Sequence, residues 1–108
     1  MIKDTKIKGV IFNIVEKIKE NYKPEKIILY GSFVYGNPDK DSDIDLLIIK
    51  DTTDRPIARC VNVRQIMTID EDALISPLVI TPREMEHRLA RGDQFLQQII
   101  SKGEVLYG

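Results

Sequence analysis

The sequence has one cysteine, almost no net charge and no long apolar segment. A single cysteine, Cys60, excludes an intrachain disulfide and a cysteine-based zinc cluster, which favours a reducing, cytoplasmic setting. The net charge of −1 argues against a surface built for bulk nucleic-acid binding. No run approaches the ~18 apolar residues of a membrane span. Lys3, Lys6 and Lys8 interrupt the N-terminal segment, so we expect neither a signal peptide nor a membrane anchor.

The composition is that of one small globular domain. The chain has 108 residues, of which 43% are hydrophobic and 31% charged, and this length can bury one modest core. We therefore expect a single domain over residues 1–108.

Hydrophobic periodicity predicts alternating helices and strands. Strands are expected at residues 26–30, 43–50 and 73–80, with a short terminal strand at 104–107. Helices are expected at residues 4–21, 57–67, 82–90 and 94–102, with a helical turn at 32–35 and an acidic loop at 68–72. Pro77 cannot donate a ladder hydrogen bond, so it predicts that its strand is at an edge or bulged. This order predicts a small α/β (α+β) fold with a short mixed sheet backed by helices.

The residues that suggest a chemical function lie where the first expected strand ends and the second begins. Gly31 lets the main chain approach an anion closely, and the Ser32 hydroxyl can donate to a phosphate oxygen. Asp43 and Asp45 alternate along a strand, so both side chains point to one face. Paired carboxylates are hard ligands that suit Mg²⁺ bridged to phosphates. The pattern indicates metal-dependent phosphate chemistry, and the competing interpretation is a polar hairpin whose aspartates cap turns.

Other reactive residue types have simpler interpretations. Cys60 is interpreted as a small buried residue on a helix rather than a reactive thiol. His87 has no second histidine or cysteine near it, and we place it on a solvated helix face. For Tyr35, beside Ser32, both a packing role and a contact with a base or a partner stay open.

Two segments resemble a known family. The run Gly31-Ser32-x-x-x-Gly36 followed by Ser42-Asp43-Ile44-Asp45-Leu46-Leu47 resembles the signature of the DNA polymerase beta-like nucleotidyltransferase superfamily. The small size and the ending over residues 99–107 resemble its minimal form, the MNT domain. The resemblance implies a mixed sheet flanked by helices and transfer of a nucleoside monophosphate, expected to be AMP from ATP, with two Mg²⁺ ions. It implies that Gly31 and Ser32 hold the triphosphate and that Asp43 and Asp45 are the catalytic metal ligands.

The resemblance also implies a third carboxylate, on the strand after the linking helix. Ser76 occupies the position where the family pattern expects this acid. A hydroxyl is neither a strong metal ligand nor a useful base at neutral pH. Asp70, Glu71 or Asp72 can replace the missing acid only if the strand begins earlier than residue 73.

Minimal domains of this kind resemble antitoxins that pair with helical HEPN proteins. The resemblance implies a toxin–antitoxin role in which the chain neutralises its partner, by binding it or by attaching AMP to it. Two hypotheses follow: an Mg²⁺-dependent nucleotidyltransferase that modifies a partner hydroxyl, and a weakened, nucleotide-binding antitoxin that acts by occupying its partner. A homo-oligomer is compatible with both.

Overall fold

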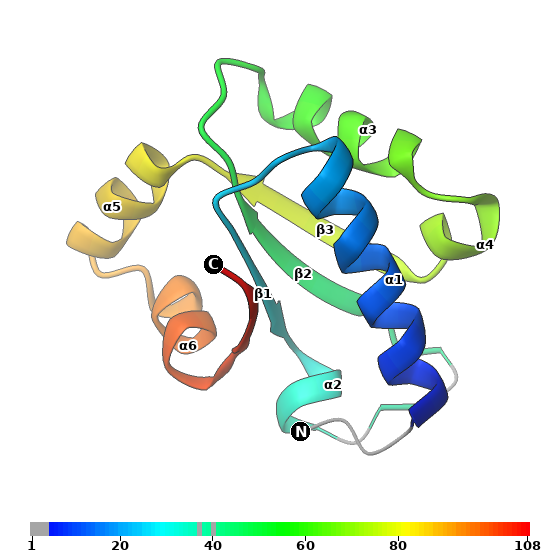
Figure 1. Cartoon of the computed structure of the whole chain (residues 1–108). Coiled ribbons are helices and arrows are strands. Elements are labelled where there is room, and N and C mark those ends of the chain that lie inside the picture. Colours follow the sequence, from blue (N-terminus) through cyan, green and yellow to red (C-terminus); the bar gives the residue numbers. More distant parts are fainter. Residues whose placement is uncertain (1–4, 37, 40) are drawn as a thin grey trace.

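A mixed four-stranded sheet is the centre of the structure, a computed structural model that describes residues 5–36, 38–39 and 41–108 (Figure 1). The elements are α1 Thr5–Asn21, β1 Lys26–Tyr30, α2 Ser32–Tyr35, β2 Ile44–Ile49, α3 Pro56–Ile66, α4 Ile69–Asp72, β3 Ile75–Ile80, α5 Pro82–Ala90, α6 Gln94–Lys102 and β4 Glu104–Tyr107. The strand order is β3-β2-β1-β4. β1 runs antiparallel to β2 and β4, whereas β2 and β3 are parallel. The predicted fold class is confirmed.

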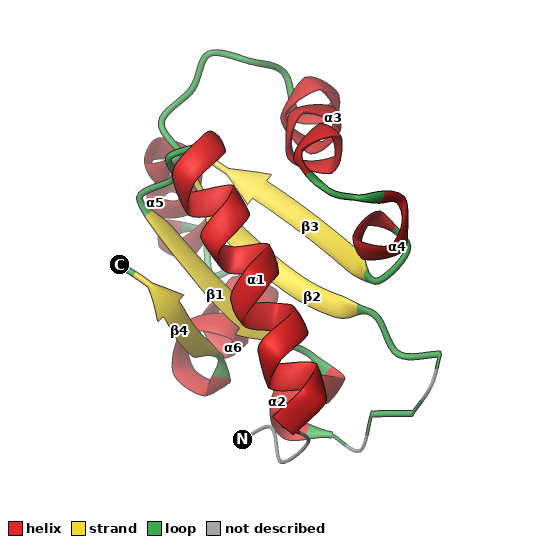
Figure 2. Cartoon of the chain, turned by 45° about the vertical axis from the view of Figure 1, so that its right-hand side comes forward, coloured by secondary structure: helices red, strands yellow, loops and turns green. Residues whose placement is uncertain are grey.

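Helices cover both faces of the sheet. α1 crosses one face (Figure 2), where it packs with α3. α5 and α6 pack on the other face. The first core includes Ile14, Ile18, Leu29, Leu46, Ile48 and Val63, and the second includes Ile28, Leu47, Ile80, Met85, Leu96 and Ile99. Each face therefore has its own apolar core.

The central strand β2 fixes the direction of the two aspartates. Leu46 and Ile48 are fully buried on the α1 face, and Leu47 is fully buried on the α5/α6 face, as predicted from the continuous apolar run. Side chains alternate along a strand. Asp43 and Asp45, four and two residues before Leu47, therefore lie on the α5/α6 face.

Most predicted elements are confirmed within one or two residues, and one local prediction was wrong. Residues 68–72 are not an acidic loop: Thr68 and Glu71 form a reciprocal capping box that starts the short helix α4. The N-cap of α3 is Arg55, which makes no side-chain capping bond. Asp4, the first residue of the expected N-terminal helix, lies outside the described residues.

The outer edge of β3 is covered by side chains of α3. Arg59 is 6% exposed and donates to the Val79 carbonyl at 3.3 Å and to both carboxylate oxygens of Glu84 at 2.6 and 3.2 Å. The half-buried Cys60 thiol lies 3.7 Å from the Pro77 carbonyl oxygen. Pro77 is thus on an edge strand, as predicted, and polar side chains satisfy carbonyls that would otherwise be an open edge.

Among the described residues, no helix has both the length and the apolar character that crossing a membrane requires.

Candidate nucleotide and metal site

The candidate site lies where β1 ends and β2 begins. Asp45 is paired across the antiparallel ladder with Tyr30, the residue before Gly31. Asp43 directly precedes β2 and is exposed, whereas Asp45 is half-buried. The fold therefore brings Gly31, Asp43 and Asp45 to one corner of the sheet, on the α5/α6 face.

Gly31 is in van der Waals range of the Asp45 carboxylate. Its backbone has φ 84° and ψ −154°, a region that side-chain-bearing residues rarely adopt. A Cβ at this position would overlap Oδ2 of Asp45 and lie 3.0 Å from Cγ. A glycine is required here for both reasons, and its main chain can approach a ligand held by Asp45.

Ser32 begins the single-turn helix α2, as predicted. The Gly31 carbonyl accepts hydrogen bonds from the N–H groups of Val34 and Tyr35 at 3.0 and 3.2 Å. Within the described residues, the Ser32 hydroxyl and the Ser32 N–H make no hydrogen bond. Both are donors that stay available to an anion beside Gly31.

The loop between α2 and β2 contains Asn37 and Lys40, which lie outside the described residues. In its described part, the Ser42 hydroxyl accepts from the Asp39 N–H at 2.9 Å, and Oδ1 of Asp39 accepts from the Asp41 N–H at 2.8 Å. Ser42 therefore shapes the turn that precedes Asp43.

Ser76 lies beside Asp45 on the neighbouring strand. The two residues are register partners in the parallel β2/β3 pair. Ser76 shares the α5/α6 face, because its neighbours Ile75 and Val79 point into the α1 core. The residue expected at the third-acid position thus reaches the site, and it is a serine.

The acidic residues of α4 do not supply the third carboxylate that the resemblance implies. β3 begins at Ile75, later than predicted, so residues 70–72 are not part of the strand. Glu71 accepts from Lys17 of α1 at 2.6 Å, and Asp72 pairs with Arg64 of α3 at 2.9 Å. These contacts point both side chains toward the helices of the opposite face. No cluster of three His, Cys, Asp or Glu side chains able to hold a metal occurs in the described part of the chain.

Within the described residues, no cationic side chain pairs with the two aspartates of the site. Burial raises the pKa of the Asp45 carboxyl, and the nearby Asp43 carboxylate raises it further. Among the described residues, neither aspartate takes part in an ion pair or a side-chain hydrogen bond. Two close carboxylates without a cationic partner are stabilised by a bound cation.

The donor set fits Mg²⁺ carried by a nucleotide. Mg²⁺ retains several waters and commonly takes only one or two protein carboxylates together with substrate phosphates. Asp43 and Asp45 supply that number. A second ion at Asp45 would have only the Ser76 hydroxyl from β3, which is a poor ligand.

Other candidate residues keep their simple interpretations. His87 is exposed on α5, and Arg88 pairs with Asp93 at 2.9 Å at the end of that helix. Cys60 is half-buried rather than fully buried as expected, and its thiol lies against the Pro77 carbonyl at the outer edge of β3. Tyr35 is 49% exposed on α2.

Comparison with known proteins agrees with this geometry. The four-stranded mixed sheet flanked by helices is a fold of the nucleotidyltransferase type. A model of the family described as Polymerase beta, Nucleotidyltransferase matches residues 13–108, so the chain belongs to this family. A search of curated proteins gave no match.

Two residues near the site were missed by sequence reasoning. Tyr30 and Phe95 are in contact, with ring centroids 5.7 Å apart and planes at 87°. Burial raises the pKa of Tyr30 to about 12, with further contributions from Asp45 and Tyr35. The only sequence signal for Tyr30 is its position directly before Gly31, and nothing local distinguishes Phe95.

Proposed function

We propose that the chain is a nucleotidyltransferase-family module that binds Mg²⁺-ATP and acts mainly by occupying a partner protein, with nucleotidyl transfer weakened. The observation that carries this proposal is the register of Asp45 with Ser76. Gly31, Ser32, Asp43 and Asp45 supply the groups proposed to bind the nucleotide, whereas β3, the strand expected to supply the activating acid, supplies the Ser76 hydroxyl.

Each residue has a role that follows from its chemistry. The Gly31 main chain and the Ser32 hydroxyl bind phosphate oxygens, because the main chain is accessible and the hydroxyl is unpaired within the described residues. Asp43 and Asp45 hold Mg²⁺. When bound, the ion neutralises charge on the phosphates. Ser76 cannot accept a proton from an attacking hydroxyl at neutral pH, so it leaves the acceptor unactivated.

A second function is favoured by the intact aspartate pair: transfer of AMP from ATP to a hydroxyl of a HEPN-type partner. Asp43 and Asp45 share one face without an ion-pair partner among the described residues. An acceptor protein that brings its own base would compensate for Ser76. A toxin–antitoxin role and a cytoplasmic location accompany both functions in this proposal.

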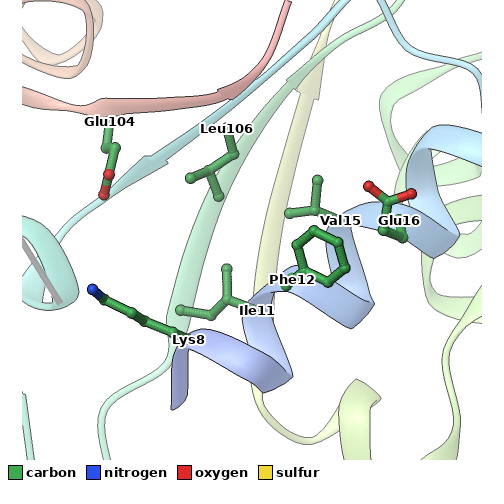
Figure 3. A pocket seen from close by; sticks show the side chains of 7 residues that line it. All are labelled: Lys8, Ile11, Phe12, Val15, Glu16, Glu104 and Leu106. Atoms are coloured by element: carbon green, nitrogen blue, oxygen red, sulfur yellow. The ribbon is translucent and has the colours of Figure 1, made fainter. Parts of the chain in front are cut away.

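The surface proposed for the partner is an apolar groove between α1 and β4 (Figure 3). Its volume is about 320 Å³. Its centre is formed by Ile11, Phe12, Val15 and Leu106, and Lys8 and Glu104 lie at one end with Glu16 at the other. Phe12 is 63% exposed and lines the groove together with Ile11, Val15 and Leu106, so its exposed ring is part of a contiguous apolar surface.

We propose that a helix, rather than a strand, occupies this groove. β4 is an edge strand of only four residues, its pairing with β1 is bulged at Ile27 and Ile28, and Glu104 is exposed. Short, bulged and charged edges resist strand addition. An apolar floor with polar ends suits an amphipathic helix. A helical HEPN-type partner satisfies this requirement.

The two functions are separated by one experiment. The chain is incubated with Mg²⁺, ATP labelled on the α-phosphate, and a HEPN-type partner. The first function predicts a stable complex with little label on the partner, and Asp43→Asn with Asp45→Asn leaves the complex intact. Rapid label transfer that this double variant abolishes would establish the second function. A partner that neither binds nor is labelled would contradict both.

A further inference from the structure

An aromatic pair lies beside the candidate site. Tyr30 is at the end of β1, and Phe95 is on α6, which packs on the same strand (Figure 1). Their ring centroids are 5.7 Å apart, with the planes at 87°. Because the two rings are perpendicular, at most one face of Phe95 is covered by Tyr30.

The pair is directly connected to the phosphate and metal residues. Tyr30 precedes Gly31 in the chain and is the register partner of Asp45. Tyr30 also interacts electrostatically with Asp45 and Tyr35. Phe95 therefore contacts a residue, Tyr30, that borders the corner of the sheet where Gly31 and Asp45 meet.

Core packing does not account for Phe95. The neighbouring Leu96 and Ile99 fill the core beneath α6 with 0% and 1% exposure, whereas Phe95 is 48% exposed. The chain has only 3 phenylalanines, 4 tyrosines and no tryptophan. Three of these seven aromatic residues, Tyr30, Tyr35 and Phe95, surround this corner.

We infer that Phe95 is the platform on which the base of the bound nucleotide stacks, with Tyr30 holding the ring in place. This inference rests on the proposed nucleotide binding at Gly31, Ser32, Asp43 and Asp45. The free face of Phe95 offers the flat apolar surface that a purine or pyrimidine ring requires, and stacking of this kind tolerates any base. The phosphates bind at Gly31 and the base at Phe95, so the two ends of the ligand are recognised by different elements.

The test compares ATP with inorganic tripolyphosphate, which has the same phosphate chain and no base. Both are titrated with Mg²⁺ into the unmodified chain and into Phe95→Leu, Phe95→Trp and Ile100→Ala. Ile100 is the matched control, because it lies on the same helix and is 49% exposed. Thermal unfolding of each variant checks that the fold is retained.

The inference predicts that Phe95→Leu weakens ATP binding about tenfold and leaves tripolyphosphate binding unchanged, while Ile100→Ala alters neither. Phe95→Trp retains ATP binding. Since the natural chain has no tryptophan, its fluorescence reports on this position alone, and it changes with ATP but not with tripolyphosphate.

Failure of the stacking inference and failure of the proposed nucleotide binding give different results. If the unmodified chain binds ATP no more tightly than tripolyphosphate, or if Phe95→Leu binds ATP as well as the unmodified chain does, the stacking inference is wrong and nucleotide binding stands. If the unmodified chain binds neither ligand, the proposed nucleotide binding fails and the stacking inference fails with it.

Discussion

Ser76 and Asp45 are register partners on adjacent parallel strands, with both side chains on the α5/α6 face. This pairing predicts that Ser76→Asp restores the missing carboxylate. We expect Mg²⁺-dependent label transfer to a partner hydroxyl to increase about a hundredfold, within the range of general-base contributions. The measurement is the initial rate of transfer from labelled ATP.

The matched control for Ser76→Asp is Ser76→Asn, which has a similar size and no charge. Equal transfer rates in the two variants, with Mg²⁺-ATP binding retained in both, would contradict the assignment of position 76 to the third-acid role.

Gly31 is predicted to be indispensable to the site. Gly31→Ala combines an unfavourable backbone conformation with a clash against Asp45. The free energy of unfolding should fall by roughly 1–3 kcal/mol, and Mg²⁺-ATP binding should be lost, because either Gly31 or the carboxylate must move. Chemical denaturation and calorimetric titration measure the two effects.

Gly9→Ala is the internal control for that variant. Gly9 lies in α1 with open space where a Cβ would be, so alanine should stabilise the helix by about 1 kcal/mol. A Gly31→Ala chain as stable as Gly9→Ala would contradict the proposed close contact.

Asp45 is predicted to make the metal-free protein less stable as pH rises. Its folded-state pKa is raised, first by burial and then by Asp43. The folded state therefore binds more protons than the unfolded state between the ordinary aspartate pKa and the raised one, and stability declines across that window. Asp45→Asn should remove this decline, so the free energy of unfolding of the variant should increase relative to that of the unmodified chain as pH rises through this window.

Mg²⁺ should make the unmodified chain more stable than Asp45→Asn, because it stabilises the unmodified chain and not the variant. Urea denaturation at pH 3 to 7, with and without Mg²⁺, measures both effects. Asp51→Asn, at an exposed position outside the site, is the control. A stability difference between Asp45→Asn and the unmodified chain that does not change with pH or Mg²⁺ would count against a charged, metal-binding carboxyl.

Phe12 is predicted to be central to partner binding and irrelevant to nucleotide binding. Phe12→Glu places a charge in the centre of the α1–β4 groove while keeping a residue that favours helices. We expect partner affinity to fall at least tenfold, as for a residue at the centre of an interface. Because the groove lies on the α1 side of the sheet and Asp45 on the other, Mg²⁺-ATP affinity should not change.

Ile69→Glu is the comparison, because Ile69 is 90% exposed on α4 and does not line the groove. Pull-down and titration against the same partner measure both variants. Equal loss of partner affinity in Phe12→Glu and Ile69→Glu would show that the groove has no special role.

Local signals predicted most of the fold. The three-and-four spacing in α1, the Thr81–Glu84 capping box and the apolar run of β2 each depend on residues close in sequence. The same holds for Gly31, Ser32, Asp43 and Asp45, since the ends of two consecutive strands must meet. The resemblance implied that Ser76 stands in the third-acid position, and the strand register shows that Ser76 lies beside Asp45.

Long-range contacts could not be predicted. Arg59 is a charged residue at a buried position of α3. Its burial is explained by its hydrogen bonds to Glu84 and to the Val79 carbonyl, which are distant in sequence. The contact between Tyr30 of β1 and Phe95 of α6 joins residues that are far apart in the sequence. Residues 68–72 were misassigned because their acidic composition concealed a capping box.

The central claim is that Asp43 and Asp45 bind a nucleotide through Mg²⁺. Calorimetric titration of ATP into the unmodified chain and into Asp43→Asn, with and without Mg²⁺, tests it most directly. We expect saturable one-site binding of ATP that requires Mg²⁺. The affinity should fall at least about tenfold in Asp43→Asn, because a charged metal ligand is lost. ATP binding of equal strength in both proteins, or binding that does not depend on Mg²⁺, would contradict it.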